Sequence, residues 1–371
     1  MTARPRLRAA LLAWYEASQR DLPWRRTRDP YAIWISETML QQTRVETVIP
    51  YYERFLARFP DVGALARADE DELMGHWAGL GYYRRARHLQ AAARTLLAEF
   101  GGSLPRDADA LRRLSGVGRY TAGAIASIAF DRPEPVLDGN VTRVLARLLD
   151  LREDVGAAAT RERLWSEAGA WARGPRPGDL NQALMELGAS VCTPGAPRCE
   201  ACPLAPGCAA RAAGDPEALP VKRPKAPPRP LRAACAWIAR RGRVLLVRRP
   251  PGGLLGGLWE LPGGELAPRE TAAAGLARVL REGVGLQVAG VRRAGTVGHV
   301  FTHRVLELAV FRAEAAGRVR RTAFDAHRWL EPHRLASLPT STAARKALAL
   351  FAAGPGPRSR PAARRDTAVG P

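Results

Sequence analysis

Several features are scarce in this sequence of 371 residues, and each scarcity excludes a class of protein. No apolar run reaches the roughly 20 residues that a membrane-spanning helix needs, and the amino-terminal segment has no signal-peptide cleavage site. Cysteine occurs only five times, and four of the five lie close together. This distribution argues against a disulfide scaffold and for a metal site in a reducing compartment. We therefore expect a cytoplasmic protein with no membrane association.

Acidic residues are scarce relative to basic ones. The chain contains 36 Asp and Glu residues and 57 Lys and Arg residues, which gives a formal net charge of +21. Such a surplus points to a polyanionic partner such as nucleic acid, although part of it reflects a bias toward arginine and alanine. Hydrophobic residues make up 46% of the chain. This content excludes wholesale disorder, and the length suffices for two domains with separate cores.

The hydrophobic pattern changes along the chain. In residues 1–214 it has helical spacing and never alternates as in a strand, which predicts an all-α domain. Residues 215–230 are rich in proline and basic side chains and predict a stiff linker. Short β-rich runs and two helical runs in residues 231–353 predict an α/β domain, and residues 354–371 resemble a disordered basic tail.

Residues 114–138 carry a helix-hairpin-helix pattern. A Gly116-Val117-Gly118 turn leads into an apolar helix that begins near Arg119, so backbone N–H groups are exposed at a helix start. Such groups bind a phosphate oxygen without reading any base. Asp138 precedes the next apolar-periodic run and is placed to cap that helix. We interpret the turn as a DNA-anchoring device.

The helix around Glu37 carries a less specific signal. The sequence from Trp34 predicts a helix with Ser36 near its start, and Pro50 is predicted to begin the next helix. Glu37 would then lie in a first turn, where the helix dipole favours an acidic side chain. Taken alone, this position indicates a structural role.

The cysteine cluster carries a stronger signal. Cys192, Cys199, Cys202 and Cys208 are separated by six, two and five residues. Four thiolates at this spacing can surround one zinc ion or one cuboidal iron-sulfur cluster, and the spacing does not distinguish the two. Cys235 lies in a strand-like run and is expected in a core.

Together these motifs resemble the MutY-type adenine DNA glycosylases of the helix-hairpin-helix superfamily. The resemblance covers about residues 5–350 and rests on SETMLQQT, GLGYYRRAR, LSGVGRYTAG, VLDGN and C-x6-C-x2-C-x5-C. It implies an all-α helix-hairpin-helix glycosylase domain with an iron-sulfur loop at residues 192–208, followed by an α/β Nudix-like domain. The implied cofactor is a 4Fe-4S cluster with a mainly structural role.

The resemblance also implies roles for individual residues. Glu37 would protonate the departing adenine and Asp138 would stabilise the oxocarbenium-like sugar, as two carboxylates do in glycoside hydrolysis. Desolvation would have to raise the pKa of Glu37 for that role. Tyr120 and Asn140 would help to hold the sugar and Asp138. The implied DNA contacts are Trp24, Arg26 and Glu186 in the adenine pocket, Gln42 and Tyr82 at the extruded base, and Gly116, Val117 and Gly118 in the hairpin.

The second domain resembles a Nudix fold whose metal site is broken. Five positions follow the Nudix box: Gly264, Glu270, Arg278, Glu282 and Gly285. Val279 and Gly283 replace two of its three clustered glutamates, so too few carboxylates remain to hold magnesium against a pyrophosphate. The resemblance instead implies recognition of 8-oxoguanine opposite adenine. The family's Phe-Ser-His contact corresponds to Phe301, Thr302 and His303.

We therefore expect a nucleoid-associated monomer that hydrolyses the N-glycosidic bond of adenine mispaired with 8-oxoguanine or guanine in double-stranded DNA. In endonuclease III a lysine nucleophile follows the hairpin arginine, whereas Tyr120 stands here. No Schiff base can form at this position, so base removal without efficient strand cleavage is expected. The alternatives are an endonuclease III-like glycosylase and lyase, a magnesium-dependent nucleotide hydrolase, and a DNA-binding protein without activity.

Overall fold

The chain forms two compact units, which divide between Ala226 and Pro227. The structure is a computed structural model that describes residues 3–224, 226–253, 255–301, 303–320 and 322–352. Thr302 and the predicted tail lie outside these residues. Among the helices described, none has both the length and the hydrophobicity of a membrane span.

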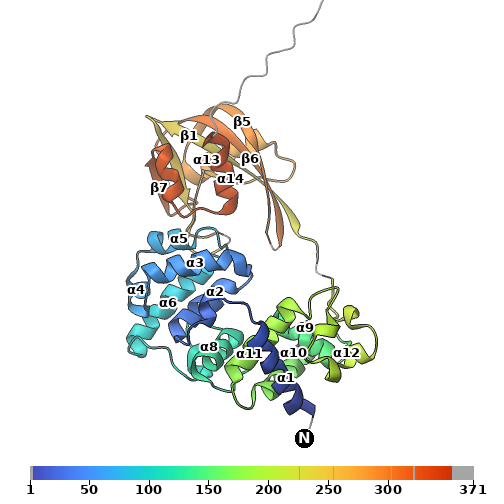
Figure 1. Cartoon of the computed structure of the whole chain (residues 1–371). Helices are drawn as coiled ribbons and strands as arrows, with labels where there is room; N and C mark the ends of the chain where they lie inside the picture. Colours follow the sequence, from blue (N-terminus) through green and yellow to red (C-terminus); the bar gives the residue numbers. More distant parts are fainter. Residues whose placement is uncertain (1–2, 225, 254, 302, 321, 353–371) are drawn as a thin grey trace, which may run out of the picture. The chain divides into compact units, whose positions relative to one another are not determined.

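The first unit is helical, as predicted, and its described part contains no strand (Figure 1). Its α-helices are α1 Ala3–Ser18, α2 Pro30–Leu40, α3 Val45–Arg58, α4 Val62–Arg67, α5 Glu70–Trp77, α6 Arg84–Glu99, α7 Ala108–Arg112, α8 Arg119–Phe130, α9 Gly139–Leu148, α10 Ala158–Ala172, α11 Pro177–Ser190 and α12 Ala209–Ala212. Short 3-10 helices are η1 Pro23–Arg25, η2 Cys199–Ala201, η3 Ala205–Gly207 and η4 Pro216–Ala218. Because α8 packs against both α2 and α11, it links the α2–α6 group to the group formed by α1 and α9–α12 (Figure 1).

The predicted start of the helix that carries Glu37 is wrong. Asp29 caps α2 by accepting hydrogen bonds from the Tyr31 and Ala32 amides, and Pro30 occupies the first turn. An acidic cap followed by proline is a stronger start signal than Ser36, which lies inside the helix. Glu37 therefore lies in the last turn of α2 rather than in the first.

The predicted role of Pro50 is also wrong. Helix α3 begins at Val45 and continues through Pro50, which is in its interior. Proline removes one backbone donor there. The buried side chains Val48, Tyr52 and Phe55 lie on both sides of it and hold the helix against the domain, so tertiary packing outweighs the missing hydrogen bond.

The start of the predicted linker packs against the helical unit. Leu219 is buried, and its carbonyl accepts a hydrogen bond from Nε of Arg147 at 3.0 Å. The carbonyl of Val221 accepts one from the Val155 amide at 3.1 Å. These two contacts attach the segment that follows the cysteine cluster to the helices beneath it.

In its described residues the second unit is a seven-stranded mixed sheet between helices, as expected for an α/β domain. Its elements are β1 Arg229–Arg240, β2 Arg243–Arg248, β3 Trp259–Glu260, β4 Gly263–Glu265, α13 Ala272–Val284, β5 Gln287–Val300, β6 Arg304–Ala316, β7 Ala326–Leu330, η5 Pro332–Ser337 and α14 Thr342–Ala352. The main strand order is β3-β2-β1-β6-β5, with β1 and β6 parallel and the other neighbours antiparallel. Sequence reasoning missed β5, whose mostly exposed residues include three glycines and two arginines and lack the hydrophobic signature of a strand.

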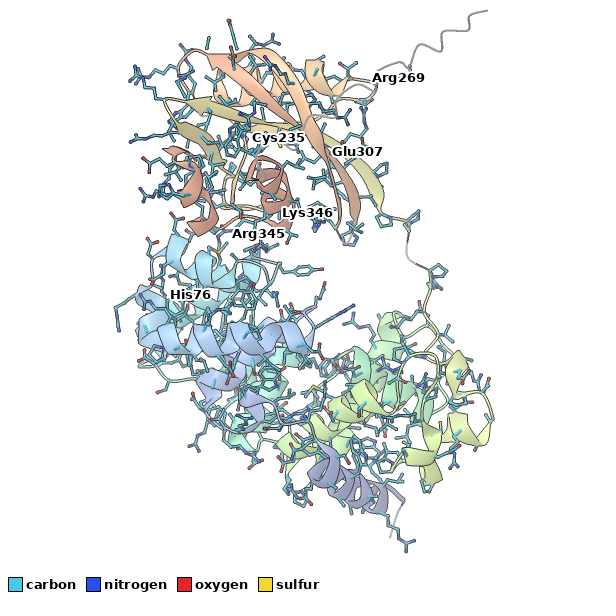
Figure 2. The ribbon with its side chains drawn as sticks, turned by 45° about the horizontal axis from the view of Figure 1, so that its top comes forward. His76, Cys235, Arg269, Glu307, Arg345 and Lys346 are labelled. Atoms are coloured by element: carbon cyan, nitrogen blue, oxygen red, sulfur yellow. The ribbon has the colours of Figure 1, made fainter. Side chains whose placement is uncertain are left out.

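Strand β1 divides the core of this unit into two layers. Ala234, Ala236 and Ile238 face one cluster, which α13 completes, whereas Cys235 and Trp237 face the other, to which α14 contributes. This alternation follows from the two-residue repeat of a strand. Cys235 thus lies in the core, as predicted (Figure 2).

Candidate active site

Glu37 is a buried carboxyl group with a strongly perturbed pKa. Only 5% of the residue is exposed. Burial raises its pKa to about 7; the hydrogen bond from Tyr120 opposes this shift, the charge of Asp138 adds to it, and the charge of Arg25 lowers it. The partial negative charge at the carboxyl end of α2 also disfavours the ionised form. Glu37 can therefore hold a proton near neutral pH and release it to a neighbouring group.

Tyr120 contacts one of the two predicted carboxyl groups and lies within electrostatic reach of the other. It is the second residue of α8, and its hydroxyl donates a hydrogen bond to Oε2 of Glu37 at 2.7 Å. Burial and then the charges of Glu37 and Asp138 raise the pKa of Tyr120 well above its ordinary value, so it stays a neutral donor. Residues far apart in the chain thus lie within electrostatic reach of one another in the folded domain.

Asp138 is held rigidly at the start of α9. As predicted, it is the N-cap, and its Oδ1 accepts the Val141 amide at 2.7 Å. Its Oδ2 accepts Nδ2 of Asn140 at 2.9 Å. Burial raises the pKa of Asp138, and these hydrogen bonds oppose the shift. Arg143 extends the network by donating to Oδ1 of Asn140 at 2.9 Å and to the carbonyl of Cys192 at 2.7 Å.

The hairpin presents an exposed helix start, as predicted. Helix α8 begins at Arg119, with the exposed Gly118 as its N-cap. Gly116 is exposed at φ +77°, and a Cβ atom there would lie 2.6 Å from Cβ of His88, so no other residue fits. Val117 is buried between the two glycines and anchors the turn.

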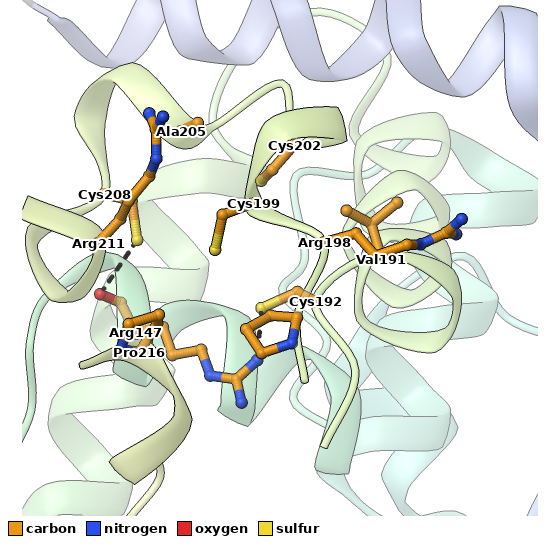
Figure 3. Close-up of a pocket in the computed structure, with 11 residues that line it drawn as sticks. Arg147, Val191, Cys192, Arg198, Cys199, Cys202, Ala205, Cys208, Arg211 and Pro216 are labelled. Atoms are coloured by element: carbon orange, nitrogen blue, oxygen red, sulfur yellow. Dashed lines mark hydrogen bonds between the residues drawn. The ribbon is translucent and has the colours of Figure 1, made fainter. Parts of the chain in front are cut away.

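The four clustered cysteines surround one pocket (Figure 3). Figure 3 shows their sulfur atoms spread around its centre, and no three metal-ligating side chains among the described residues converge closely enough for a single ion. Arg147, only 2% exposed, donates from Nη1 to Sγ of Cys192 at 3.2 Å. Its buried charge complements thiolates better than thiols. Arg198 and Arg211 add two further cations to the wall of the pocket.

Comparisons with known proteins bear on both units. Residues 35–169 match the HhH-GPD superfamily base excision DNA repair proteins, and residues 233–350 match the NUDIX domain. The adenine DNA glycosylases of Homo sapiens and Mus musculus are each 38% identical to this chain, over 93% of it and over 73% and 77% of the respective relative. The chain belongs to the adenine DNA glycosylase family.

This membership confirms the predicted fold class and the enzyme class, a DNA glycosylase of base excision repair that hydrolyses N-glycosyl bonds. Among solved structures, a thermostable thymine-DNA glycosylase matches with 29% identity and a TM-score of 0.51, over 57% of this chain and 97% of that chain. That match spans the length of a single glycosylase domain.

Arg25, which sequence reasoning missed, hydrogen-bonds Glu186, and its charge lowers the pKa of Glu37. Glu186 is 1% exposed and accepts hydrogen bonds from Arg20 at 2.7 and 2.9 Å and from Arg25 at 2.7 Å. Burial opposes ionisation of Glu186, but these hydrogen bonds outweigh it and lower its pKa. Arg26 instead pairs with Asp21 at the surface. Trp24 is buried and packs edge-on against Tyr52, with ring centroids 5.5 Å apart.

Gln42 and Tyr82 lie on two loops close to the end of α2. Both side chains are exposed, and both residues have left-handed backbones, at φ +59° and +47°. Non-glycine residues adopt this conformation rarely and at a cost, and active sites are among the places where it is retained. The loops therefore present their side chains in a conformation that the surrounding fold must enforce.

The NUDIX domain keeps two box carboxylates, and an arginine neutralises both. Arg278 donates to Glu270 at 2.8 and 2.9 Å and to Glu282 at 3.1 Å. The hydrogen bond from Arg278 is the main reason why the pKa of Glu270 falls to about 2. Val279 fills the space beside Gly264. The two remaining box carboxylates, Glu270 and Glu282, are thus ion-paired with Arg278, and Val279 occupies the place of a third.

Phe301 and His303 lie at the tip of the β5–β6 hairpin. The Phe301 amide donates to the carbonyl of Arg304 at 2.8 Å, which closes the turn. The Phe301 ring meets the ring of His299 edge-on with centroids 4.6 Å apart, a partner that sequence reasoning missed. Val300 is 68% exposed, so the tip presents apolar and aromatic groups together.

Proposed function

We propose that this enzyme removes adenine from A:8-oxoguanine and A:G mispairs in double-stranded DNA, with Glu37 as the general acid and Asp138 as the electrostatic stabiliser. The observation that carries this proposal is the pairing of Glu37 with Tyr120 beside a fixed Asp138. Glu37 can hold a proton near neutral pH, whereas hydrogen bonds from Val141 and Asn140 favour the ionised form of Asp138 against the rise in pKa that burial causes.

In the proposed reaction the bond between adenine and the sugar breaks, and its electron pair leaves with the base. Glu37 transfers its proton to the departing adenine, so the leaving group is neutral. Positive charge develops on the sugar, where the carboxylate of Asp138 stabilises it. A water molecule then adds to the sugar and gives its proton to Glu37, which restores the acid. Tyr120 orients the acid throughout through its 2.7 Å hydrogen bond.

The enzyme is proposed to be monofunctional. A lyase step requires an amine to form a Schiff base with the opened sugar. Tyr120 occupies the position after the hairpin arginine, and the only lysines in the sequence are Lys222, Lys225 and Lys346. The helical domain before Lys222 therefore offers no lysine amine to the site.

Incubation with a labelled A:8-oxoguanine duplex tests this function. We expect strand breaks only after alkali treatment, and no covalent DNA adduct after borohydride reduction. Breaks without alkali together with a borohydride adduct would indicate the endonuclease III-like alternative. Intact DNA after alkali would contradict adenine excision altogether.

We further propose that the four cysteines hold a 4Fe-4S cluster, which would supply a cross-link between η2, η3 and the end of α11. The pocket offers four thiols spread around one centre and the buried Arg147 as a counter-charge. Arg143 and Arg147 on α9 contact the same loop, so the ordered loop supports the helix that Asp138 caps.

Iron analysis tests the cluster. Cys199→Ser is expected to lose the iron and the brown colour of the purified protein, because a hydroxyl is a poor ligand for iron-sulfur clusters. Cys235→Ala, which changes a core cysteine outside the pocket, should retain the full iron content. A colourless parent protein that contains zinc would contradict the cluster and leave the glycosylase proposal standing.

The NUDIX domain is proposed to recognise 8-oxoguanine through Phe301, Thr302 and His303 rather than to hydrolyse nucleotides. The hairpin tip presents the Phe301 ring and the exposed His303, whose imidazole can hydrogen-bond a base. The pairing of Glu270 and Glu282 with Arg278 leaves no free carboxylate array for magnesium among the described box residues. A net charge of +21 suits a DNA-bound enzyme.

Phe301→Ala is expected to reduce excision from A:8-oxoguanine about tenfold and to leave excision from A:G unchanged, since one base–aromatic contact is worth about 1–3 kcal/mol. The measurement is excision rate against duplex concentration for both mispairs. Leu350→Ala, which removes an exposed apolar side chain from α14, serves as the control. Equal losses on both mispairs would contradict the recognition role.

A further inference from the structure

Arg85 is a buried arginine whose contacts are concentrated on two loops. It lies on α6, is 8% exposed, and burial lowers its pKa to about 10. Its Nη1 donates to the carbonyls of Thr38, Met39 and Gln41 at 2.7, 2.9 and 2.7 Å, and its Nη2 to Thr43 Oγ1 and the carbonyls of Leu80 and Gly81 at 3.2, 3.3 and 3.1 Å. All these acceptors lie within four residues of Gln42 or Tyr82.

Chain connectivity does not fix the separation of the two loops, because about forty residues lie between Gln42 and Tyr82 in the sequence. Gln42 has acceptors of Arg85 on both sides, at Gln41 and Thr43. Tyr82 directly follows the acceptor Gly81, and its ring also lies 5.6 Å from the Arg85 guanidinium. A single planar group therefore hydrogen-bonds both loops and joins them directly, in addition to the hydrogen bonds from Trp77 to Gly81 and from Gln41 to Thr121 that hold each loop to the domain.

The same guanidinium also satisfies the end of α2. The carbonyls of Thr38 and Met39 are among the last four of that helix, which have no partner inside it. A cation at a helix C-terminus is favoured by the helix dipole. Trp77 covers the guanidinium from another side at 5.2 Å. Arg85 thus connects the helix that carries Glu37 to both loops.

We infer that Arg85 is a positioning residue that presets Gln42 and Tyr82 as a rigid pair for opening the duplex at the mispair. The inference rests on the proposed function, in which these side chains contact the DNA where adenine is extruded. Without the hydrogen bonds from Arg85, the left-handed backbones at Gln42 and Tyr82 would relax to other conformations. The free energy needed to order them again would add to the cost of base extrusion.

Arg85→Lys tests the inference, because an ammonium keeps the charge but has only three donors and no planar fork. We expect the single-turnover rate constant for excision from A:8-oxoguanine to fall about 10- to 100-fold, as a misplacement of about 1 Å would cause. The fluorescence increase of 2-aminopurine placed beside the target adenine should also be lost. Arg94→Lys is the matched control, since Arg94 lies exposed on the same helix and donates one hydrogen bond, to the Ala66 carbonyl at 3.2 Å.

Active-site titration separates positioning from a loss of folded protein. Poor folding lowers the burst amplitude, whereas mispositioning lowers the rate constant of the molecules that remain active. Thr43→Val is a second, milder variant that removes the 3.2 Å contact with Arg85 and the long 3.5 Å hydrogen bond from Thr43 Oγ1 to the Gln41 carbonyl. We expect a rate about threefold lower with full amplitude.

A double-mutant cycle completes the test. In a Gln42→Ser/Tyr82→Ser background, adding Arg85→Lys should reduce the rate by less than twofold further, because the residues act as one unit. Parental rate constant and fluorescence in Arg85→Lys, or losses that add fully in the cycle, would overturn the inference. A parent enzyme that excises no adenine would instead contradict the proposed function.

Discussion

Glu37→Gln is expected to lower adenine excision by about 10²- to 10⁴-fold, the usual contribution of a general acid. Gln keeps the size of the side chain and can accept the Tyr120 hydrogen bond, so the site should remain folded and duplex binding should persist. Single-turnover excision and a gel-shift titration measure the two properties. Glu53→Gln, an exposed change on α3, serves as the control. Equal losses of binding and excision would argue for a structural role.

The pH dependence of excision provides a second test of Glu37 with the same Glu37→Gln variant. Because the pKa of Glu37 is about 7, the excision rate of the parent should fall about tenfold per pH unit above neutrality, and Glu37→Gln should abolish this fall.

The raised pKa of Glu37 also makes the stability of the folded protein depend on pH. Between the ordinary value of 4.5 and about 7 the folded state binds more protons than the unfolded state, so stability falls as pH rises through this window. Between pH 4 and pH 8 the free energy of unfolding of Glu37→Gln should therefore rise by about 3 kcal/mol relative to that of the parent.

Asp138→Asn is expected to lower excision by about 10²- to 10³-fold, because it removes the negative charge beside the developing sugar cation. Asparagine caps helices about as well as aspartate, so α9 should persist. The main structural loss is the Asn140 hydrogen bond, worth about 1 kcal/mol. Single-turnover excision and thermal unfolding measure the two effects.

Asp107→Asn provides a matched control for this change. Asp107 caps α7 in the same domain by accepting the Ala110 amide at 2.9 Å, and it lies at the surface. Both variants should unfold at similar temperatures, and only Asp138→Asn should lose activity. If both variants retain parental excision rates, Asp138 is merely a helix cap.

Local patterns in the sequence predicted several parts of the site correctly. Asp138 before Gly139-Asn140 indicated a helix cap, and the glycines at 116 and 118 indicated a helix that starts at Arg119. These features depend on backbone conformation and hydrogen bonds over a few residues, which adjacent residue types control. The spacing of the cysteines likewise predicted that they share one pocket.

Features that depend on distant packing were missed. Arg25 and Arg26 are adjacent and chemically identical, and only the orientation of η1 turns one toward Glu186 and the other toward solvent. The sequence YYRRAR likewise contains three arginines with no local difference that marks Arg85 as the buried one.

The amino-acid sequence alone predicted the domain types, the helix that Asp138 caps and the shared pocket of the cysteines, because these rest on residue type and short-range spacing, and its family resemblance singled out Glu37 and Asp138 as catalytic candidates. Only the tertiary structure decided that Glu37 lies in the last turn of its helix, is buried and accepts the Tyr120 hydrogen bond. The same holds for Arg85, which hydrogen-bonds two loops with left-handed residues. Desolvation and long-range hydrogen bonding depend on which segments pack together, and no property of a residue's neighbours in the chain specifies that packing.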